Sequence, residues 1–220
     1  MSDWLAVLIS FLYVFAAIGM AELLRHVRHA GPDFTRKFVH IAVGMWALGT
    51  VFLFENRWFA IIPPATFIVL NYISYRQNIF KAMEDADKTN LGTVYFPFAF
   101  CIVILTLWDH PQLVVAVLMP LTWGDAMAAV FGKMYRQIPY AVFGQSRTVA
   151  GSISMFVFSG LSVYLTLLLI SPAVDSLRGL GIAAITALGA TITEALSPWG
   201  IDNLTIPLVS GVVLYFFLGS

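Results

Sequence analysis

Eight apolar runs separated by short polar breaks dominate the chain and restrict it to a fold that spans a membrane. The runs cover residues 4–21, 38–54, 58–75, 93–108, 112–131, 152–170, 179–195 and 203–219. A helix needs about 20 mainly apolar residues to cross a bilayer; the fourth and eighth runs are short, so seven spans remain an alternative to eight. Only 11% of the residues are charged, against about 25% in soluble domains. We therefore predict an all-α, polytopic transmembrane helical bundle that forms one membrane domain over residues 1–220.

The distribution of basic residues predicts how this bundle is oriented. Ten of the twelve Lys and Arg residues fall in the first, third and fifth loops, namely Arg25, Arg28, Arg36, Lys37, Arg76, Lys81, Lys88, Lys133, Arg136 and Arg147. Cytoplasmic loops of membrane proteins carry an excess of Lys and Arg. We therefore expect these loops in the cytoplasm and the N-terminus outside, with the polar residues of the spans gathered at the cytoplasmic leaflet.

The stretch TWGDAMAAVFGK, residues 122–133, places a carboxylate inside the fifth run. An ionised Asp at the bilayer centre costs about 2.5–3.5 kcal/mol on insertion scales. Asp125 and Lys133 lie on one stripe of a helix, beside a face of small residues that includes Gly124 and Gly132. Two interpretations stay open: a helix-packing face with an internally paired Asp125, or a metal or proton site that faces a polar cavity.

The fifth loop, residues 133–150, is long and basic and contains a glycine. Arg147, Thr148, Gly151 and Ser152 stand where the next helix begins. Backbone amides at a helix N-terminus, together with a guanidinium group, suit a phosphate. The alternative is an ordinary cytoplasmic loop that ends in a Thr or Ser helix cap.

Two further polar groups border the spans. Glu194 and the pair Asp202-Asn203 flank a proline turn, and such carboxylates can converge on Mg²⁺, which prefers oxygen ligands; otherwise they are polar ends of spans. Arg36, Lys37 and His40 begin the second span. They are either phosphate ligands with His40 as a base, or residues that mark the cytoplasmic boundary.

Acidic groups for Mg²⁺ and basic groups for phosphate, at one membrane face, indicate a soluble phosphate compound that meets a lipid. Phosphoryl transfer needs mainly positioning and charge neutralisation. Such a site takes a nucleotide from water and an alcohol from the bilayer. The net charge of zero gives the chain no overall attraction to nucleic acid.

Three motifs in fixed order, RKFVHIAVG, TWGDAMAAVFGK…QSRTVAGSISMF and EALSPWGIDNLTIPL, resemble the polyprenol/dolichol kinase family, in its short phytol and farnesol kinase branch. The resemblance runs from residue 36 to residue 208. It implies a multi-pass kinase that phosphorylates an isoprenoid alcohol of the phytol, farnesol or geranylgeraniol type, usually with CTP. For this branch we expect the inner membrane of a bacterium or cyanobacterium.

The family motifs fall on particular residues of this chain. The Asp of the family's Gly-Asp motif falls on Asp125, its Asp-Asn pair on Asp202 and Asn203, and its basic Thr…Gly-Ser segment on Arg147, Thr148, Gly151 and Ser152. Arg147 replaces the commoner Lys, and Ala150 stands at the position of a Glu. The resemblance implies that Asp125, Asp202 and Glu194 hold Mg²⁺ and that Lys133 and Arg147 neutralise the transferred phosphate. The base stays open among Asp125, Asp202 and His40.

Two other functions remain as alternatives. A CTP-dependent cytidylyltransferase that makes a CDP-lipid shares the membrane context, but the chain lacks the dense Asp- and Lys-rich terminal signature of such enzymes. A small ion-coupled transporter would use Asp125 and Glu194 as coupling carboxylates. Transporter sites favour the bilayer midplane and inverted repeats, whereas here the polar groups crowd one leaflet and no repeat is found.

Overall fold

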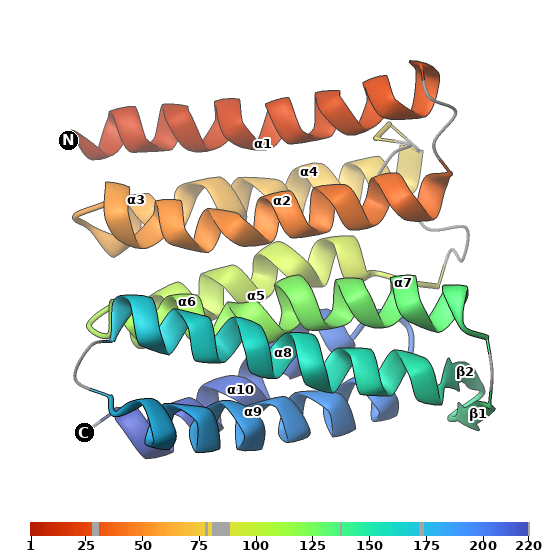
Figure 1. Cartoon of the computed structure of the whole chain (residues 1–220). Coiled ribbons are helices and arrows are strands. Elements are labelled where there is room, and N and C mark those ends of the chain that lie inside the picture. The colour runs from red at the N-terminus through yellow and green to blue at the C-terminus, as the bar shows by residue number, and fades with distance from the viewer. Residues whose placement is uncertain (28–30, 78, 81–88, 137, 172–173, 220) are drawn as a thin grey trace.

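The computed structural model describes residues 1–27, 31–77, 79–80, 89–136, 138–171 and 174–219. Its helices form one bundle (Figure 1): α1 (Asp3–Val27), α2 (Pro32–Leu53), α3 (Arg57–Ala60), α4 (Ile62–Gln77), α5 (Gly92–Leu107), α6 (Pro111–Met119), η1 (Pro120–Asp125), α7 (Ala126–Met134), α8 (Val149–Ile170), α9 (Ser176–Leu196) and α10 (Asp202–Leu218). One small hairpin, β1 (Pro139–Val142) and β2 (Gln145–Thr148), accompanies them. The prediction of an all-α polytopic fold is confirmed.

Each predicted run carries helix, and the structure shows which runs can span a bilayer. Six segments of the described chain are long and apolar enough: Asp3–Val27, Asp33–Leu53, Arg57–Gln77, Pro111–Met134, Val149–Ile170 and Ser176–Leu196. The fourth and eighth runs form α5 and α10, which are the shorter apolar helices that the sequence predicts. α1 begins and α10 ends at the same end of the bundle (Figure 1), as an even number of crossings requires. This placement fits six or eight crossings and disfavours seven.

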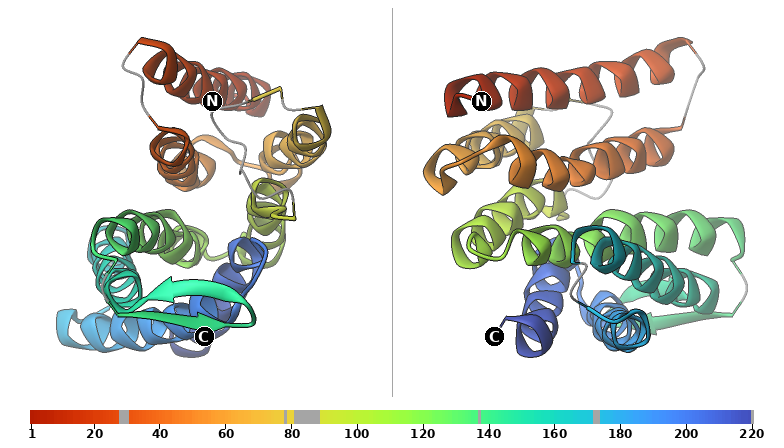
Figure 2. Two further views of the ribbon diagram at one scale, coloured as in Figure 1. Left: turned by 90° about the vertical axis from the view of Figure 1, so that its right-hand side faces the viewer. Right: turned by 60° about the vertical axis from the view of Figure 1, so that its left-hand side comes forward.

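The opposite end of the bundle carries the hairpin, and we call it the hairpin end (Figure 2). The strands pair antiparallel, with Tyr140 opposite Arg147, around a two-residue turn at Phe143-Gly144. Both turn residues have positive φ, 48° and 78°, as in a type I′ turn. The sequence predicts only a long, basic loop at residues 133–150. Its Phe-Gly pair is not one of the Asn-Gly or Asp-Gly signals for this turn. Arg28, Lys81 and Lys88, which the orientation argument uses, lie outside the described residues.

The fifth run forms the centre of the bundle. Every residue from Leu113 to Met119 is at most 3% exposed, so this helix is enclosed by protein. After α6 the helix widens into the π-helical turn η1. Pro120 has no amide hydrogen to donate to the preceding turn, which removes one α-helical bond at this point. Asp125 is the last residue of the π-helical turn, a type of distortion found often at functional sites.

The small-residue face predicted beside Asp125 packs against α8. A Cβ atom added at Gly124 would contact Ser159 and come within 2.8 Å of the Met155 sulfur. A Cβ at Gly132 would lie 3.4 Å from the Cα of Gly151. The glycines therefore pack on α8 and Asp125 lines a cavity, while its role as a metal or proton site stays a prediction.

Candidate active site

One cavity of about 670 Å³ lies within the bundle, and its lining includes Pro139, Ser146 and Arg147 of the hairpin. The twelve predicted site residues all line it: Arg36, Lys37, His40, Asp125, Lys133, Arg147, Thr148, Gly151, Ser152, Glu194, Asp202 and Asn203. They come from α2, η1, α7, β2, α8, α9 and α10, so the fold brings residues up to 167 positions apart to one space. Their chemical roles stay predictions.

Asp125 is paired with two residues of α2. Its Oδ2 atom lies 2.6 Å from Lys37 Nζ and 3.5 Å from His40 Nε2. All three side chains are nearly buried, with 11–13% of each exposed. Both contacts are made by Oδ2, and no hydrogen bond within the described chain reaches Oδ1. The carboxylate therefore has one oxygen held by α2 and one left for a ligand.

His40 is fixed by the π-helical turn. Its Nε2 atom donates a hydrogen bond to the carbonyl of Leu121 at 2.8 Å, and because a carbonyl only accepts, this contact assigns the hydrogen to Nε2. The ring also meets Phe96 of α5 edge-on, with centroids 4.7 Å apart. His40 thus lies between the charged residues and the aromatic ring of Phe96.

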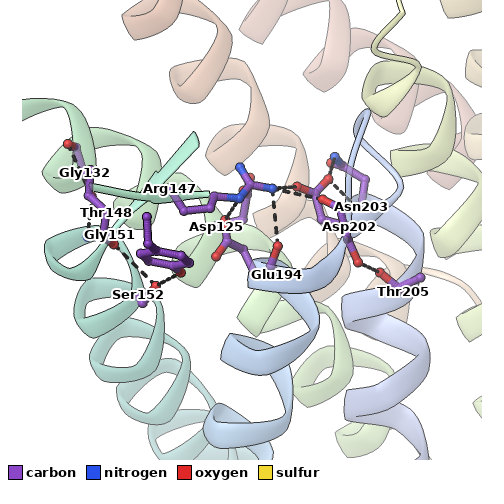
Figure 3. A network of polar contacts seen from close by, with 12 residues as sticks. Asp125, Gly132, Arg147, Thr148, Gly151, Ser152, Glu194, Asp202, Asn203 and Thr205 are labelled. Atoms are coloured by element: carbon purple, nitrogen blue, oxygen red, sulfur yellow. Dashed lines mark hydrogen bonds and ion pairs between the residues drawn. The ribbon is translucent and has the colours of Figure 1, made fainter. Parts of the chain in front are cut away.

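Arg147 joins the hairpin to the corner between α9 and α10 (Figure 3). Its Nη2 atom donates to the carbonyls of Glu194 at 3.3 Å and Ser197 at 3.0 Å. Ion pairs connect Nε with Glu194 Oε1 at 3.2 Å and Nη2 with Asp202 Oδ2 at 3.6 Å. The carbonyls at a helix C-terminus lack helical partners and attract cations, so α9 ends where a guanidinium group is favourable.

The turn after α9 fixes Asp202 through its neighbour. Asn203 donates from its backbone N and its Nδ2 to Asp202 Oδ1, each at 2.9 Å. The preceding Gly200 has φ of +80°, and a Cβ atom there would lie 2.6 Å from the backbone N of Gly92. Only glycine fits this close approach.

The segment resembling a phosphate site is also a helix cap. Thr148 Oγ1 accepts a hydrogen bond from Gly151 N at 3.1 Å at the start of α8. Thr148 is therefore the N-cap of α8, as the alternative interpretation of this segment expects. Ser152 Oγ lies 2.6 Å from Tyr140 Oη, which ties α8 to β1. Lys133 forms an ion pair with Asp33, and both side chains are 56% exposed; it lies at the cavity mouth rather than beside Asp125.

Sequence reasoning missed Asn71 of α4, although an amide inside an apolar run is itself a signal. Asn71 lines the cavity and donates from Nδ2 to the carbonyl of Thr93 at 2.7 Å. Its Oδ1 is buried and has no hydrogen-bond partner in the described part of the chain.

The three predicted metal ligands, Asp125, Asp202 and Glu194, do not form a preorganised metal site. Among the described residues, no three His, Cys, Asp or Glu side chains are grouped so that they could hold a metal ion. Asp125 is paired with Lys37, and Glu194 and Asp202 with Arg147. Mg²⁺ is commonly bound through one or two carboxylates together with substrate phosphates. The oxygen donors along the cavity suit that arrangement.

Comparisons with known proteins agree with the motifs. The chain is 28% identical to a phytol kinase from Synechocystis sp. over 223 residues, which cover 98% of this chain and 94% of the relative. It is 26% identical to a probable chloroplastic phytol kinase of Glycine max, over 94% of this chain and 73% of the relative. A CTP-dependent diacylglycerol kinase of Schizosaccharomyces pombe is 26% identical over 66% of this chain and 68% of its own length.

No family profile and no solved structure matches the chain. The two phytol kinase relatives match 98% and 94% of this chain, so the similarity extends over nearly the whole bundle. Together they support a polyprenol/dolichol kinase-like family for this chain, within its phytol kinase branch.

Proposed function

We propose that the protein transfers the terminal phosphoryl group of CTP to the hydroxyl of an isoprenoid alcohol, of the phytol, farnesol or geranylgeraniol type. The relatives that are named phytol kinase and CTP-dependent diacylglycerol kinase support the reaction class. The observation that carries the proposal is a single cavity with a charged part and an apolar part. We place this multi-pass protein in the inner membrane of a bacterium or cyanobacterium.

The charged part suits a triphosphate. Five basic residues line it, Arg36, Lys37, Lys133, Arg136 and Arg147, against three acidic ones, Asp125, Glu194 and Asp202. This excess of positive charge is complementary to a polyphosphate. We assign phosphate binding to Lys37 and Arg147. The Lys37 side chain is nearly buried and the Arg147 side chain is half-buried, and each already pairs with a carboxylate that a nucleotide phosphate can replace.

The apolar part suits the alcohol's hydrocarbon chain. We call it the apolar arm; it is lined by Val14, Ile18, Val39, Val43, Trp46, Thr50, Pro63, Pro64, Phe67, Phe96, Pro97 and Phe100 from α1, α2, α4 and α5. His40 and Phe96 lie where the arm meets the charged part. An alcohol in the arm therefore presents its hydroxyl beside Asp125 and His40.

The chemistry then requires few protein groups. The hydroxyl oxygen bonds to the terminal phosphorus, the bond from that phosphorus to CDP breaks, and the hydroxyl proton passes to Asp125 or His40. Mg²⁺, held by Asp125 and Asp202 with Glu194 nearby, would supply charge neutralisation for the phosphates. Lys37 and Arg147 orient the phosphates, and the enclosed bundle excludes water from the reacting atoms.

The position of a radioactive label separates this proposal from the alternatives. Purified protein is incubated with phytol, farnesol or geranylgeraniol and CTP labelled at the γ- or the α-phosphate. The kinase reaction puts only the γ-label into lipid. A cytidylyltransferase, which acts on a lipid phosphate, puts the α-label into lipid when the matching isoprenyl monophosphate is supplied in place of the alcohol, and a transporter leaves the lipid unlabelled. Lipid without γ-label under all conditions, from protein that remains folded, contradicts the proposal.

A further inference from the structure

Three residues other than glycine have positive φ in the described part of the chain. They are Ile138 at 53°, Phe143 at 48° and Trp199 at 52°. The left-handed region suits glycine and asparagine, and a β-branched or bulky side chain adopts it only at an energetic cost. Phe143 also occupies the first central position of a type I′ turn, where Asn is a favoured residue. Local backbone preference therefore does not explain why these three positions carry large apolar side chains.

Packing inside the protein does not explain these side chains either. Ile138 and Phe143 are each 69% exposed, and Trp199 is 56% exposed. Ile138 and Phe143 flank β1, and Trp199 lies in the turn between α9 and α10. Both places belong to the hairpin end, because Arg147 of β2 donates to the carbonyl of Ser197 in the same turn. The contact that favours these side chains therefore lies outside the chain.

The hairpin has the position and the composition of an element at a membrane interface. Its strands run across the ends of the helices rather than along them (Figure 2), and hence parallel to the plane of a bilayer that the helices span. The exposed apolar surface continues onto α7 through Met134 and Tyr135, and the basic residues Lys133 and Arg136 stand beside these two in the sequence. Aromatic rings are enriched where a bilayer meets water, and Lys and Arg are attracted to anionic headgroups.

We infer that Ile138, Phe143 and Trp199 insert into the boundary between lipid headgroups and acyl chains, and that this contact holds the hairpin against the turn between α9 and α10. Arg147 joins these two parts, with Nη2 at 3.0 Å from the Ser197 carbonyl and 3.6 Å from Asp202 Oδ2. The bilayer thereby positions Arg147 at the cavity. The inference rests on the proposed function in one respect, because Arg147 has to bind the nucleotide for the lipid contact to affect catalysis.

Depth-dependent quenching tests the contact directly. The protein is placed in nanodiscs of phosphatidylcholine and phosphatidylglycerol that carry a nitroxide on the upper part of the acyl chain. Phe143→Cys, made in Cys101→Ala protein, carries a small fluorophore at the turn. Ser146→Cys in the same background is the matched control, since Ser146 is on the same hairpin but lines the cavity. We expect the fluorescence to be lost at position 143 and mostly retained at position 146. Equal quenching at the two positions, or none at position 143, overturns the inference.

A second experiment separates the lipid contact from folding. Phe143→Asn gives the turn a residue pair that type I′ favours, so the variant should keep or raise the melting temperature. In nanodiscs we expect its kcat/KM for CTP to fall by about fivefold or more, as for a typical coupling between two sites. Phe216→Asn is the control. Phe216 is 81% exposed on α10 and lies toward the opposite end, so this variant should leave kcat/KM for CTP unchanged.

Each kinetic outcome decides one question. Unchanged kcat/KM for CTP in folded Phe143→Asn overturns the inference. If that variant does not fold, unchanged kcat/KM in Trp199→Asn overturns it equally, because Asn also suits the backbone angle of Trp199. Failure of the unaltered protein to phosphorylate any alcohol instead refutes the proposed function, and the quenching experiment still decides whether the hairpin contacts lipid.

Discussion

Lys37 and Asp125, 88 positions apart in the sequence, form an ion pair of 2.6 Å inside the bundle. The pair explains how a membrane helix accommodates a carboxylate: α2 supplies the compensating charge, and the fifth span is surrounded by protein. Each partner depends on the other, because either charge alone would be buried without compensation. Stability and activity at this position can therefore be separated by mutation.

We expect Lys37→Met to destabilise the protein by about 3–5 kcal/mol, the usual cost of breaking a buried pair from one side. The double variant Lys37→Met with Asp125→Asn should recover most of this loss, since no buried charge remains. Lys133→Met is the control; its ion pair with Asp33 is exposed and worth at most about 1 kcal/mol. Unfolding in detergent measures all three.

The double variant should be folded and nevertheless inactive, because both the carboxylate and a phosphate-binding cation are gone. Phosphorylation of an alcohol at a normal rate per folded molecule would show that the pair serves only packing. Equal instability of the single and the double variant would show that the two charges are not coupled.

Arg147 is expected to matter through the shape of its side chain as well as its charge. Arg147→Ala removes a charge-assisted contact worth about 1.5–3 kcal/mol, which corresponds to a fall of about ten- to 150-fold in kcat/KM for CTP. Arg147→Lys should retain part of the activity, since it keeps the charge but cannot reach Glu194, Ser197 and Asp202 together. Arg57→Ala, at the opposite end of the bundle, serves as control. Unchanged kcat/KM for CTP in Arg147→Ala would show that Arg147 does not bind the nucleotide and only marks the cytoplasmic side of the membrane.

Two helix caps allow a matched comparison. Thr148 caps α8 at the cavity, and Asp175 caps α9 at the opposite end through the backbone amides of Leu177 and Arg178. Replacing either residue by Ala should cost about 0.5–2 kcal/mol of stability. We expect only Thr148→Ala to raise the KM for CTP, because only that cap lines the cavity. Equal nucleotide KM in both variants would leave Thr148 with the capping role alone.

The sequence predicts the helices and the site residues better than it predicts how they meet. Apolar runs and basic loops are local signals, and all eight runs form helix. The polar residues and motifs of the sequence predict twelve site residues, and all twelve line one cavity. The pairing of Lys37 with Asp125 depends on how α2 packs on η1, which no local pattern encodes. The π-helical turn has only Pro120 as its signal, and the turn at Phe143-Gly144 is set by backbone angles rather than by the residue pair usual for it.

Removal of metal should separate the fold from the reaction. Because the described residues hold no group of three metal ligands and the carboxylates are already paired with Lys37 and Arg147, Mg²⁺ alone should leave the melting temperature nearly unchanged. Mg²⁺ with CTP should raise it, since a ligand at 100 times its Kd adds about 2.7 kcal/mol to the free energy of unfolding. Chelation should abolish phosphorylation without unfolding the protein. Asp202→Asn is the informative variant: it should lose the stabilisation by Mg²⁺ and CTP while Arg147 keeps its bond to Ser197. A large stabilisation by Mg²⁺ alone would indicate a preformed metal site, and full activity after chelation would exclude the metal from the reaction.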